Sequence, residues 1–507
     1  MAASAREAHT MSLQPLAGVE DPAGGHRLQS SHQAAADNSM FAQMEQPWAN
    51  SRAFAVDLLA LSVIAGIVGV LSYGYCWIVG ELLEKWLSAA GGLEYPEAYL
   101  KGGPALGCPF WIPLCWAGGT AVGVLKWAVG LDTFDTFLVE IRAQHCDSLP
   151  ALKTTVCCMA SLLSGAALGP EAGLAAAGGG IGTLLARVVA SLGPDYAQEE
   201  AADARRRLYV IGGICAAFGT ILPAPWVSLL ICFECSFLKV DDEGKKLSVF
   251  GRRTLFLLGI TATVAFMVRY AVKAIPPLPD LAHKAKVAGE VYDNLMPFKG
   301  ALLGILAACA ALVYAIIGAL FKAVFGKLGR VLEGCCGTSG RIICLCSLAG
   351  LTTGVLGYLV PLSLASGKEG MMPVMVHSGR SPVLGNGELV TTDLLWIAVA
   401  KTASYSAAAA GGMVGGPFFP VLFVGVVVGE MCARIPLHWS VYPAVLTVPV
   451  AMVAMPSAVF PLPFTLVAMP LSYFHLGPLW CVPILSGIIA AYTLIVGTGL
   501  VRKLAGQ

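Results

Sequence analysis

The chain has 507 residues, of which 57% are hydrophobic and only 12% are charged. A soluble domain carries about 25% charged residues because its surface must meet water, so this composition predicts a protein whose outer surface mostly faces lipid. The 32 basic and 31 acidic residues leave a net charge of +1, which creates no field to attract nucleic acid. We therefore expect no nucleic-acid partner.

Residues 1–50 are rich in Ala, Gln, Ser, Gly and His and show no sustained apolar period. This composition predicts a disordered polar tail. The segment lacks the hydrophobic core of a signal peptide, and carboxylates such as Glu7, Glu20 and Asp21 are not typical of an organelle transit peptide, which is poor in acidic residues. The sequence therefore gives no indication of import into an organelle.

Long apolar runs follow one another from Phe54 to the C-terminus. They cover about 54–79, 152–190, 208–238, 255–272, 301–325, 342–362, 394–410, 418–432, 441–460 and 479–500. Most runs approach or exceed the roughly 20 residues that a helix needs to cross the hydrocarbon. We predict an all-α, multi-pass integral membrane domain over residues 51–507, in two halves at about 54–275 and 298–503. The chain ends soon after the last run, so we expect no C-terminal regulatory domain.

Breaks in these runs recur in pairs. The break at Gly169-Pro170 is followed about fifty residues later by Pro223-Ala-Pro225, and the break at Gly415-Gly-Pro417 is followed at a similar distance by Pro461-Leu-Pro463. Interrupted helices in corresponding places indicate an internally duplicated transporter whose substrate lies near the middle of the membrane. The alternative is that Gly and Pro are simply common in membrane helices.

Basic residues give a partial prediction of orientation. One loop carries Lys245, Lys246, Arg252 and Arg253, and the last run is followed by Arg502-Lys503. Cytoplasmic loops of membrane proteins are enriched in Lys and Arg, so we expect both regions to be cytosolic. A third basic cluster, residues 205–207, is not assigned to a side by the sequence.

Glu171 is a candidate gate for an anion pathway. A dehydrated anion inside a membrane needs donors, and the backbone N–H groups at helix N-termini supply them together with a partial positive charge. Glu171 follows Gly169-Pro170 at the predicted start of a helix, and a carboxylate within a membrane is a functional-site hypothesis by default. When charged it can occupy the place of the anion, and when protonated it can leave. The alternative is a carboxylate that only stabilises the helix dipole.

Two motifs point to a known family. The segment 168–182, LGPEAGLAAAGGGIG, resembles the G-[KR]-E-G-P motif and Gly-rich helix of the CLC family of chloride channels and transporters, and 415–425, GGPFFPVLFVG, resembles its G-G-x-F-x-P-x-L-x-x-G motif. The resemblance implies a homodimer of subunits built from two inverted halves of tilted and broken helices, each with one chloride pathway. It also implies a gating role for Glu171 and anion-binding positions at Gly169, Ala172, Gly416, Phe418 and Phe419.

The chain also departs from these motifs. Pro170 stands where the family has a basic residue, and Pro417 precedes the filter phenylalanines; neither proline has an N–H to donate. The family's serine loop is expected near residues 130–134, where Asp132 and Thr133 lie but no serine matches. No tyrosine clearly matches its second hydroxyl, although Tyr492 lies on the last predicted helix. These departures leave the anion selectivity open.

Two neighbouring residues bear on the choice between a channel and an exchanger. Glu234 resembles a glutamate shared across the family, and Cys235 falls where proton-coupled members have a second glutamate. A thiol has a reference pKa of about 8.5 and is a poor proton relay near neutrality. We therefore predict a passive chloride channel with a glutamate gate. If the alignment slips by one residue, Glu234 is the relay and the protein is a proton-coupled exchanger.

Other classes of protein fit less well. A non-conducting membrane scaffold that kept the fold is the alternative of another class. No intramembrane nucleophile and base pair is found, so we expect neither an enzyme nor a cofactor. The 16 cysteines are interpreted as reduced, packed thiols. A metal site from Cys335, Cys336, Cys344 and Cys346 is the alternative, but no His pair stands at ligand spacing, and we expect no metal.

Overall fold

The structure is a computed structural model of the whole chain. It describes residues 51–92, 94–96, 99, 106–134, 137–192, 199–237, 252–272, 292–378, 389–434, 444–458, 460 and 462–498. The predicted tail at 1–50 and the basic residues at 245–246 and 502–503 lie outside these ranges, as do the C-terminal ends of the two predicted halves, at about 275 and 503.

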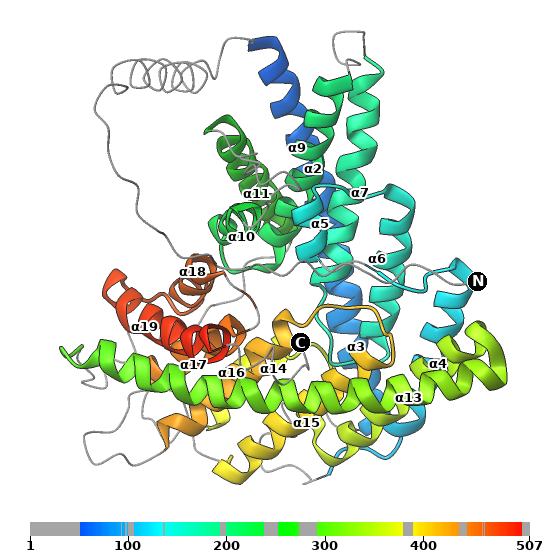
Figure 1. Cartoon of the computed structure of the whole chain (residues 1–507), viewed down its shortest axis with the longest axis vertical. Helices are drawn as coiled ribbons and strands as arrows, with labels where there is room; N and C mark the ends of the chain where they lie inside the picture. Colours follow the sequence, from blue (N-terminus) through cyan, green and yellow to red (C-terminus); the bar gives the residue numbers. More distant parts are fainter. Residues whose placement is uncertain are drawn as a thin grey trace, which may run out of the picture. The chain divides into compact units, whose positions relative to one another are not determined.

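The described chain is built from helices (Figure 1). Those of the N-terminal part are α2 (Ser51–Trp77), α3 (Leu83–Gly91), α4 (Trp111–Val129), α5 (Phe137–Ala143), α6 (Ser148–Leu163), α7 (Glu171–Ala190), α9 (Glu199–Ile221), α10 (Pro225–Phe237) and α11 (Arg252–Val272). Those of the C-terminal part are α13 (Met296–Leu359), α14 (Lys368–Ser378), α15 (Thr391–Ala410), α16 (Phe418–Ala433), α17 (Ala444–Ser457), α18 (Pro463–Tyr473) and α19 (Cys481–Tyr492). A π-helical turn, Ile78–Leu82, joins α2 to α3.

Six helical stretches of the described chain are long and apolar enough to cross a membrane: Arg52–Gly91, Trp111–Val129, Glu171–Ala190, Arg253–Val272, Met296–Leu359 and Pro478–Gly497. Large apolar side chains on them remain exposed, as Leu59 and Val70 do on α2. A surface of this kind is suited to lipid rather than to water. The prediction of an all-α, multi-pass integral membrane protein is confirmed.

The element α13 contains two of the predicted runs. Its backbone is non-helical at Gly337, which has φ 69° and ψ −178°, so the runs at 301–325 and 342–362 lie on two arms separated by this residue. Figure 1 shows the two arms meeting at a sharp bend. A positive φ is readily adopted only by glycine, which explains the residue at this corner.

The helices α7 and α16 are alike in sequence and in packing. Gly178 and Gly182 stand at the same offsets from the start of α7 as Gly425 and Gly429 do from the start of α16. The glycines of α7 approach the backbone of α9, and those of α16 approach the backbone of α17, so closely that a Cβ on any of them would lie within 3 Å of it. Small residues allow membrane helices to approach in this way. Both helices are thereby fixed in the protein interior.

The structure places the third basic cluster on the same face as Arg253. The carboxylate of Asp57, near the start of α2, accepts hydrogen bonds from Arg205 Nε at 3.0 Å and from Arg253 at 2.9 Å. The hydroxyl of Tyr209 donates to the same carboxylate at 2.9 Å. The starts of α2, α9 and α11 therefore lie together, and the cluster at 205–207 is on the same face as Arg253, which the sequence predicts to be cytosolic.

The cysteines that were considered as metal ligands do not gather. Cys335, Cys336 and Cys344 are exposed free thiols, whereas Cys346 is buried. Among the residues with a described placement, no three His, Cys, Asp or Glu side chains are arranged to hold a metal ion.

Candidate anion pathway

A short backbone bridge brings two helix starts together. Gly169 and Gly416 form an isolated antiparallel bridge, in which the N–H of Gly169 donates to the carbonyl of Gly416 at 2.7 Å and the N–H of Gly416 donates back at 2.9 Å. Each glycine stands two residues before a helix, α7 in one case and α16 in the other. Two helix N-termini with their partial positive charges therefore meet at one place, as a site for an anion requires.

The Glu171 carboxylate occupies this meeting point. The residue is 0% exposed, and its Oε1 accepts a hydrogen bond from the backbone N–H of Phe418 at 2.6 Å. A Cβ on Gly169 would lie 1.8 Å from Oε2, and a Cβ on Gly416 would lie 2.3 Å from the carboxyl carbon. Only glycine leaves room for the carboxylate on either side. The first residue of α7 thus places its negative charge on the N-terminus of α16.

The remaining predicted anion-binding positions surround the carboxylate. Ala172 follows Glu171 in the first turn of α7 and is buried. Phe418 and Phe419 open α16 and are also buried, with their rings edge to face at 5.9 Å. The structure therefore brings all of the positions that the resemblance indicates for the gate and the filter to one buried region.

Three tyrosines that the sequence analysis did not identify lie near this region. Tyr75 of α2, Tyr314 of α13 and Tyr405 of α15 each lie close enough to Glu171 for a charge on its carboxylate to act on their hydroxyl groups. The rings of Tyr314 and Tyr405 stack at 5.6 Å. Within the described ranges the buried Tyr314 hydroxyl has no hydrogen-bond partner, and neither has Oε2 of Glu171. Buried polar atoms are normally paired, so unpaired ones mark a place where a ligand or water can bind.

The two places where the sequence analysis sought hydroxyl groups lie elsewhere. Asp132 and Thr133 are exposed, and Asp132 pairs with Arg341 at 3.2 Å. Tyr492 is 39% exposed. The loop that does reach α7 comes after α5: the Thr183 hydroxyl donates to the Cys146 carbonyl at 2.5 Å, and the Cys146 thiol lies 3.7 Å from the Ala176 carbonyl.

The side chain of Glu234 contacts the first turn of α18. On α10, its carboxylate accepts hydrogen bonds from the N–H groups of Phe464 and Thr465 at 2.8 Å each and from the Thr465 hydroxyl at 2.5 Å. These donors belong to the first turn of α18, so the carboxylate has the geometry of a helix cap. Its neighbour Cys235 is fully buried. The contact connects the N-terminal half of the chain to the C-terminal half.

Two buried lysines hold the segments around the site. Lys401 of α15 is fully buried, donates to the carbonyls of Leu364 and Ala365 at 2.6 Å each, and lies 5.1 Å from the centre of the Phe423 ring. Lys126 of α4 donates to the carbonyl of Gly412 at 2.6 Å, in the turn between α15 and α16. Lys401 falls inside the predicted apolar run 394–410 and Lys126 inside the apolar helix α4, and a charge at such a position is a signal because it needs partners.

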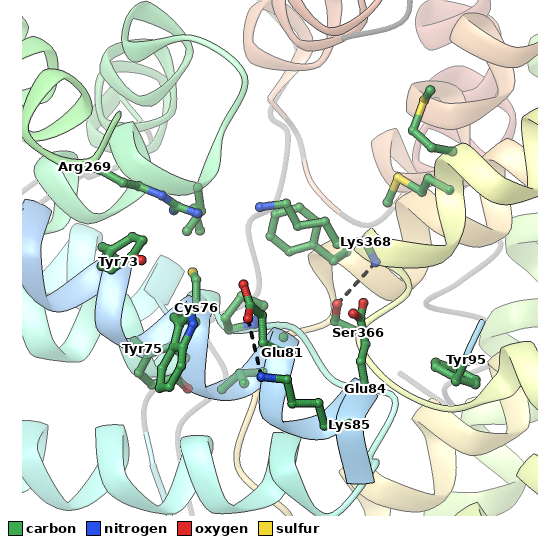
Figure 2. A pocket seen from close by; sticks show the side chains of 18 of the residues that line it. Tyr73, Tyr75, Cys76, Glu81, Glu84, Lys85, Tyr95, Arg269, Ser366 and Lys368 are labelled. Carbon is green, nitrogen blue, oxygen red and sulfur yellow. Dashed lines mark hydrogen bonds and ion pairs between the residues drawn. The ribbon is translucent and has the colours of Figure 1, made fainter. Parts of the chain in front are cut away.

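A cavity of about 1130 Å³ reaches the starts of α7 and α16. Its wall includes Pro170 and Phe419, the direct neighbours of Glu171 and Phe418, together with Tyr75 (Figure 2). One end of the cavity therefore lies one residue away from each of the two meeting helix starts.

These features define a class: a multi-pass helical membrane protein in which two interrupted helices direct their N-termini at a buried carboxylate. The sequence model of the voltage gated chloride channel family matches residues 142–495. The chain belongs to this family.

Curated relatives match over a shorter part. The protein named "Putative ion-transport protein YfeO" from Escherichia coli O1:K1 / APEC is 34% identical over 109 residues, 21% of this chain and 23% of the relative. Its namesake from Escherichia fergusonii is 32% identical over 114 residues, 22% of this chain and 24% of the relative. The matched part thus spans about a quarter of the length of these relatives.

Solved structures match over most of the chain. A slow cyanobacterial Cl⁻/H⁺ antiporter has a TM-score of 0.65 at 17% identity, over 89% of this chain and 98% of that one. A CLC-type fluoride/proton antiporter has a TM-score of 0.56 at 15% identity, over 86% and 95%. A eukaryotic CLC transporter has a TM-score of 0.54 at 14% identity, over 88% and 74%. At these identities the comparison shows the fold, and the chain has the CLC fold.

Proposed function

We propose that the protein is a passive channel for chloride or another small anion, formed as a homodimer with one pathway in each subunit and gated by Glu171. One observation carries the proposal: the Glu171 carboxylate lies between Gly169 and Gly416 and accepts the Phe418 N–H. An anion in that place accepts the same N–H group. In this proposal the protein's own carboxylate occupies the anion site and closes the pathway.

The residues of the predicted proton path support a channel over an exchanger. Both carboxylate oxygens of Glu234 accept hydrogen bonds from the start of α18, so the carboxylate is engaged as a cap of that helix. Cys235 is a buried thiol and offers no carboxylate that could relay protons. The second candidate is a proton-coupled exchanger, which is favoured by the fold shared with the two antiporters above.

Chloride flux from liposomes, measured with and without a proton gradient, tests the proposal. We expect chloride to flow down its own gradient without moving protons. Uphill proton movement driven by a chloride gradient would identify the protein as an exchanger. The absence of any anion flux from correctly folded protein would favour the non-conducting scaffold.

Glu234→Gln is expected to destabilise the fold without altering the transport mode. The amide is neutral and has only one acceptor oxygen, so it loses charge-assisted hydrogen bonds at the start of α18. Such bonds contribute about 1.5–3 kcal/mol each. Thermal unfolding in detergent should show a lower midpoint, while chloride flux per folded protein stays near that of the wild type. Cys235→Ala, at the adjacent buried position, is the control. Loss of chloride-driven proton movement in Glu234→Gln would instead assign this residue to a proton path.

A further inference from the structure

A lysine side chain supplies a positive charge at the end of the large cavity nearest to Phe419. Lys368 is the first residue of α14, and its Nζ lies 5.6 Å from the centre of the Phe419 ring. Its backbone N–H is held by the Ser366 hydroxyl at 3.2 Å. Figure 2 shows the side chains of Lys368 and Arg269 extending into the cavity from different walls. The Lys368 ammonium therefore lies beside the second residue of α16.

The cavity is on the face of the membrane domain opposite the basic cluster. Arg269 lines it from the last turn of α11, whereas Arg253 in the first turn of that helix binds Asp57 on the other face. Its wall also includes the last residues of α9 and the π-helical turn after α2. Because the basic face is predicted to be cytosolic, the cavity opens on the non-cytosolic side.

The start of α7, on the other side of the filter, supplies no charge to attract an anion. Pro170, the N-cap residue of α7, lines the same cavity and has neither a cationic side chain nor an N–H. The carboxylates Glu81, Glu84 and Glu94 also line the cavity and are repulsive to an anion. Glu81 lies 3.9 Å from Lys85, whose side chain is 69% exposed. The cation next to a filter residue is therefore Lys368.

We propose that Lys368 forms an outer anion subsite at the filter entrance, which draws a small anion through the cavity toward the Phe418 and Phe419 amides. This inference rests on the proposed anion pathway. The ammonium compensates part of the hydration that the ion loses on leaving water, and the Phe419 ring holds it in position by a cation–π contact. A fixed positive charge in a cavity with low-dielectric walls also raises the local anion concentration.

A charge series at Lys368 tests this subsite. In liposome chloride flux at about 0.01 M ionic strength, Lys368→Arg should remain near the wild type, Lys368→Gln should lose about 3- to 10-fold, and Lys368→Glu should lose more. At about 1 M salt the differences should shrink, because the Debye length falls from about 30 Å to about 3 Å. Lys85→Gln, which removes an exposed lysine from the same cavity wall, is the matched control and should have little effect.

A positive charge introduced at another position of the cavity wall should restore the flux lost in Lys368→Gln. Pro170→Lys introduced into Lys368→Gln should restore part of the flux, which a purely structural role of Lys368 does not predict. Equal flux in the Arg, Gln and Glu variants at low salt would overturn the subsite, as would a loss that does not depend on salt. Thermal unfolding of each variant confirms that it is folded.

Halide binding separates this inference from the proposed function. Isothermal titration calorimetry of purified protein with bromide measures this binding. The affinity for bromide should be about 3- to 10-fold lower in Lys368→Gln and unchanged in Lys85→Gln. If the wild type conducts no anion but this difference in binding is found, the channel is refuted and the subsite stands. If the binding of bromide is the same in all variants, the subsite is refuted whatever the flux.

Discussion

Glu171→Gln is expected to increase chloride flux about tenfold or more. The carboxylate in the wild type accepts a charge-assisted hydrogen bond from Phe418. Losing a hydrogen bond to a charged group costs about 1.5–3 kcal/mol, and each 1.4 kcal/mol is tenfold in an equilibrium. The neutral amide therefore competes less well with chloride for the N–H groups at the start of α16. Chloride efflux from liposomes, normalised to folded protein, measures the change.

The same variant should lose its dependence on pH. In the wild type, lowering the pH adds a proton to the Glu171 carboxylate, removes its charge and opens the pathway, so flux should rise toward acidic pH. Glutamine cannot titrate, and the flux of Glu171→Gln should remain high across this range. A flux in Glu171→Gln that equals the wild type at neutral pH, with the pH dependence retained, would show that Glu171 is not the gate.

Gly416→Ala is expected to expel the Glu171 carboxylate and to reduce flux about tenfold or more. A Cβ at this position would lie 2.3 Å from the carboxyl carbon, so the side chain has to leave the Phe418 N–H. The methyl group then occupies the space where the anion accepts that N–H, and the lost interaction is of the charge-assisted kind, about 1.5–3 kcal/mol. Chloride flux measures the effect on transport, and thermal unfolding of the same preparation measures the loss of stability.

A double-mutant cycle isolates the contact between these residues. In a Glu171→Ala background the carboxylate is already absent, so Gly416→Ala should destabilise the protein by much less than it does in the wild type. Coupling energies of about 0.5–3 kcal/mol are usual for residues in contact. If the two substitutions destabilise the protein additively, the carboxylate does not lie against Gly416.

The centre of the site follows from the sequence because its parts are local. Each of the two breaks combines a glycine, a proline and the first residue of a helix within three positions, so the pattern alone predicts a helix start with an accessible backbone. The resemblance then relates the two breaks. The hydrogen-bonded bridge between Gly169 and Gly416 could not be predicted, because it joins residues that are far apart in the chain.

The lining of the site was not predictable in the same way. Tyr75, Tyr314 and Tyr405 come from three different helices, and none of them belongs to a motif. A tyrosine in an apolar run has the same sequence signature whether its hydroxyl faces lipid, a neighbouring helix or an ion. Only the packing of α2, α13 and α15 around Glu171 distinguishes these cases.

The assignment of the basic cluster at 205–207 had the same limitation. Its charges are compatible with either face until Asp57 is seen to hold Arg205 and Arg253 together. Asp57 is a single acidic residue early in the first apolar run, and its partners are distant in the sequence. Long-range ion pairs of this kind follow from tertiary structure and not from local pattern.

The central claim is that the space now held by the Glu171 carboxylate is an anion site. Crystals of Glu171→Gln grown or soaked in bromide, with anomalous data collected at the bromine absorption edge, test it most directly. We expect an anomalous peak between Gly169 and Gly416, within hydrogen-bonding distance of the Phe418 N–H. A bromide-loaded crystal with no peak there, and with the substituted amide side chain still hydrogen-bonded to Phe418, would contradict it.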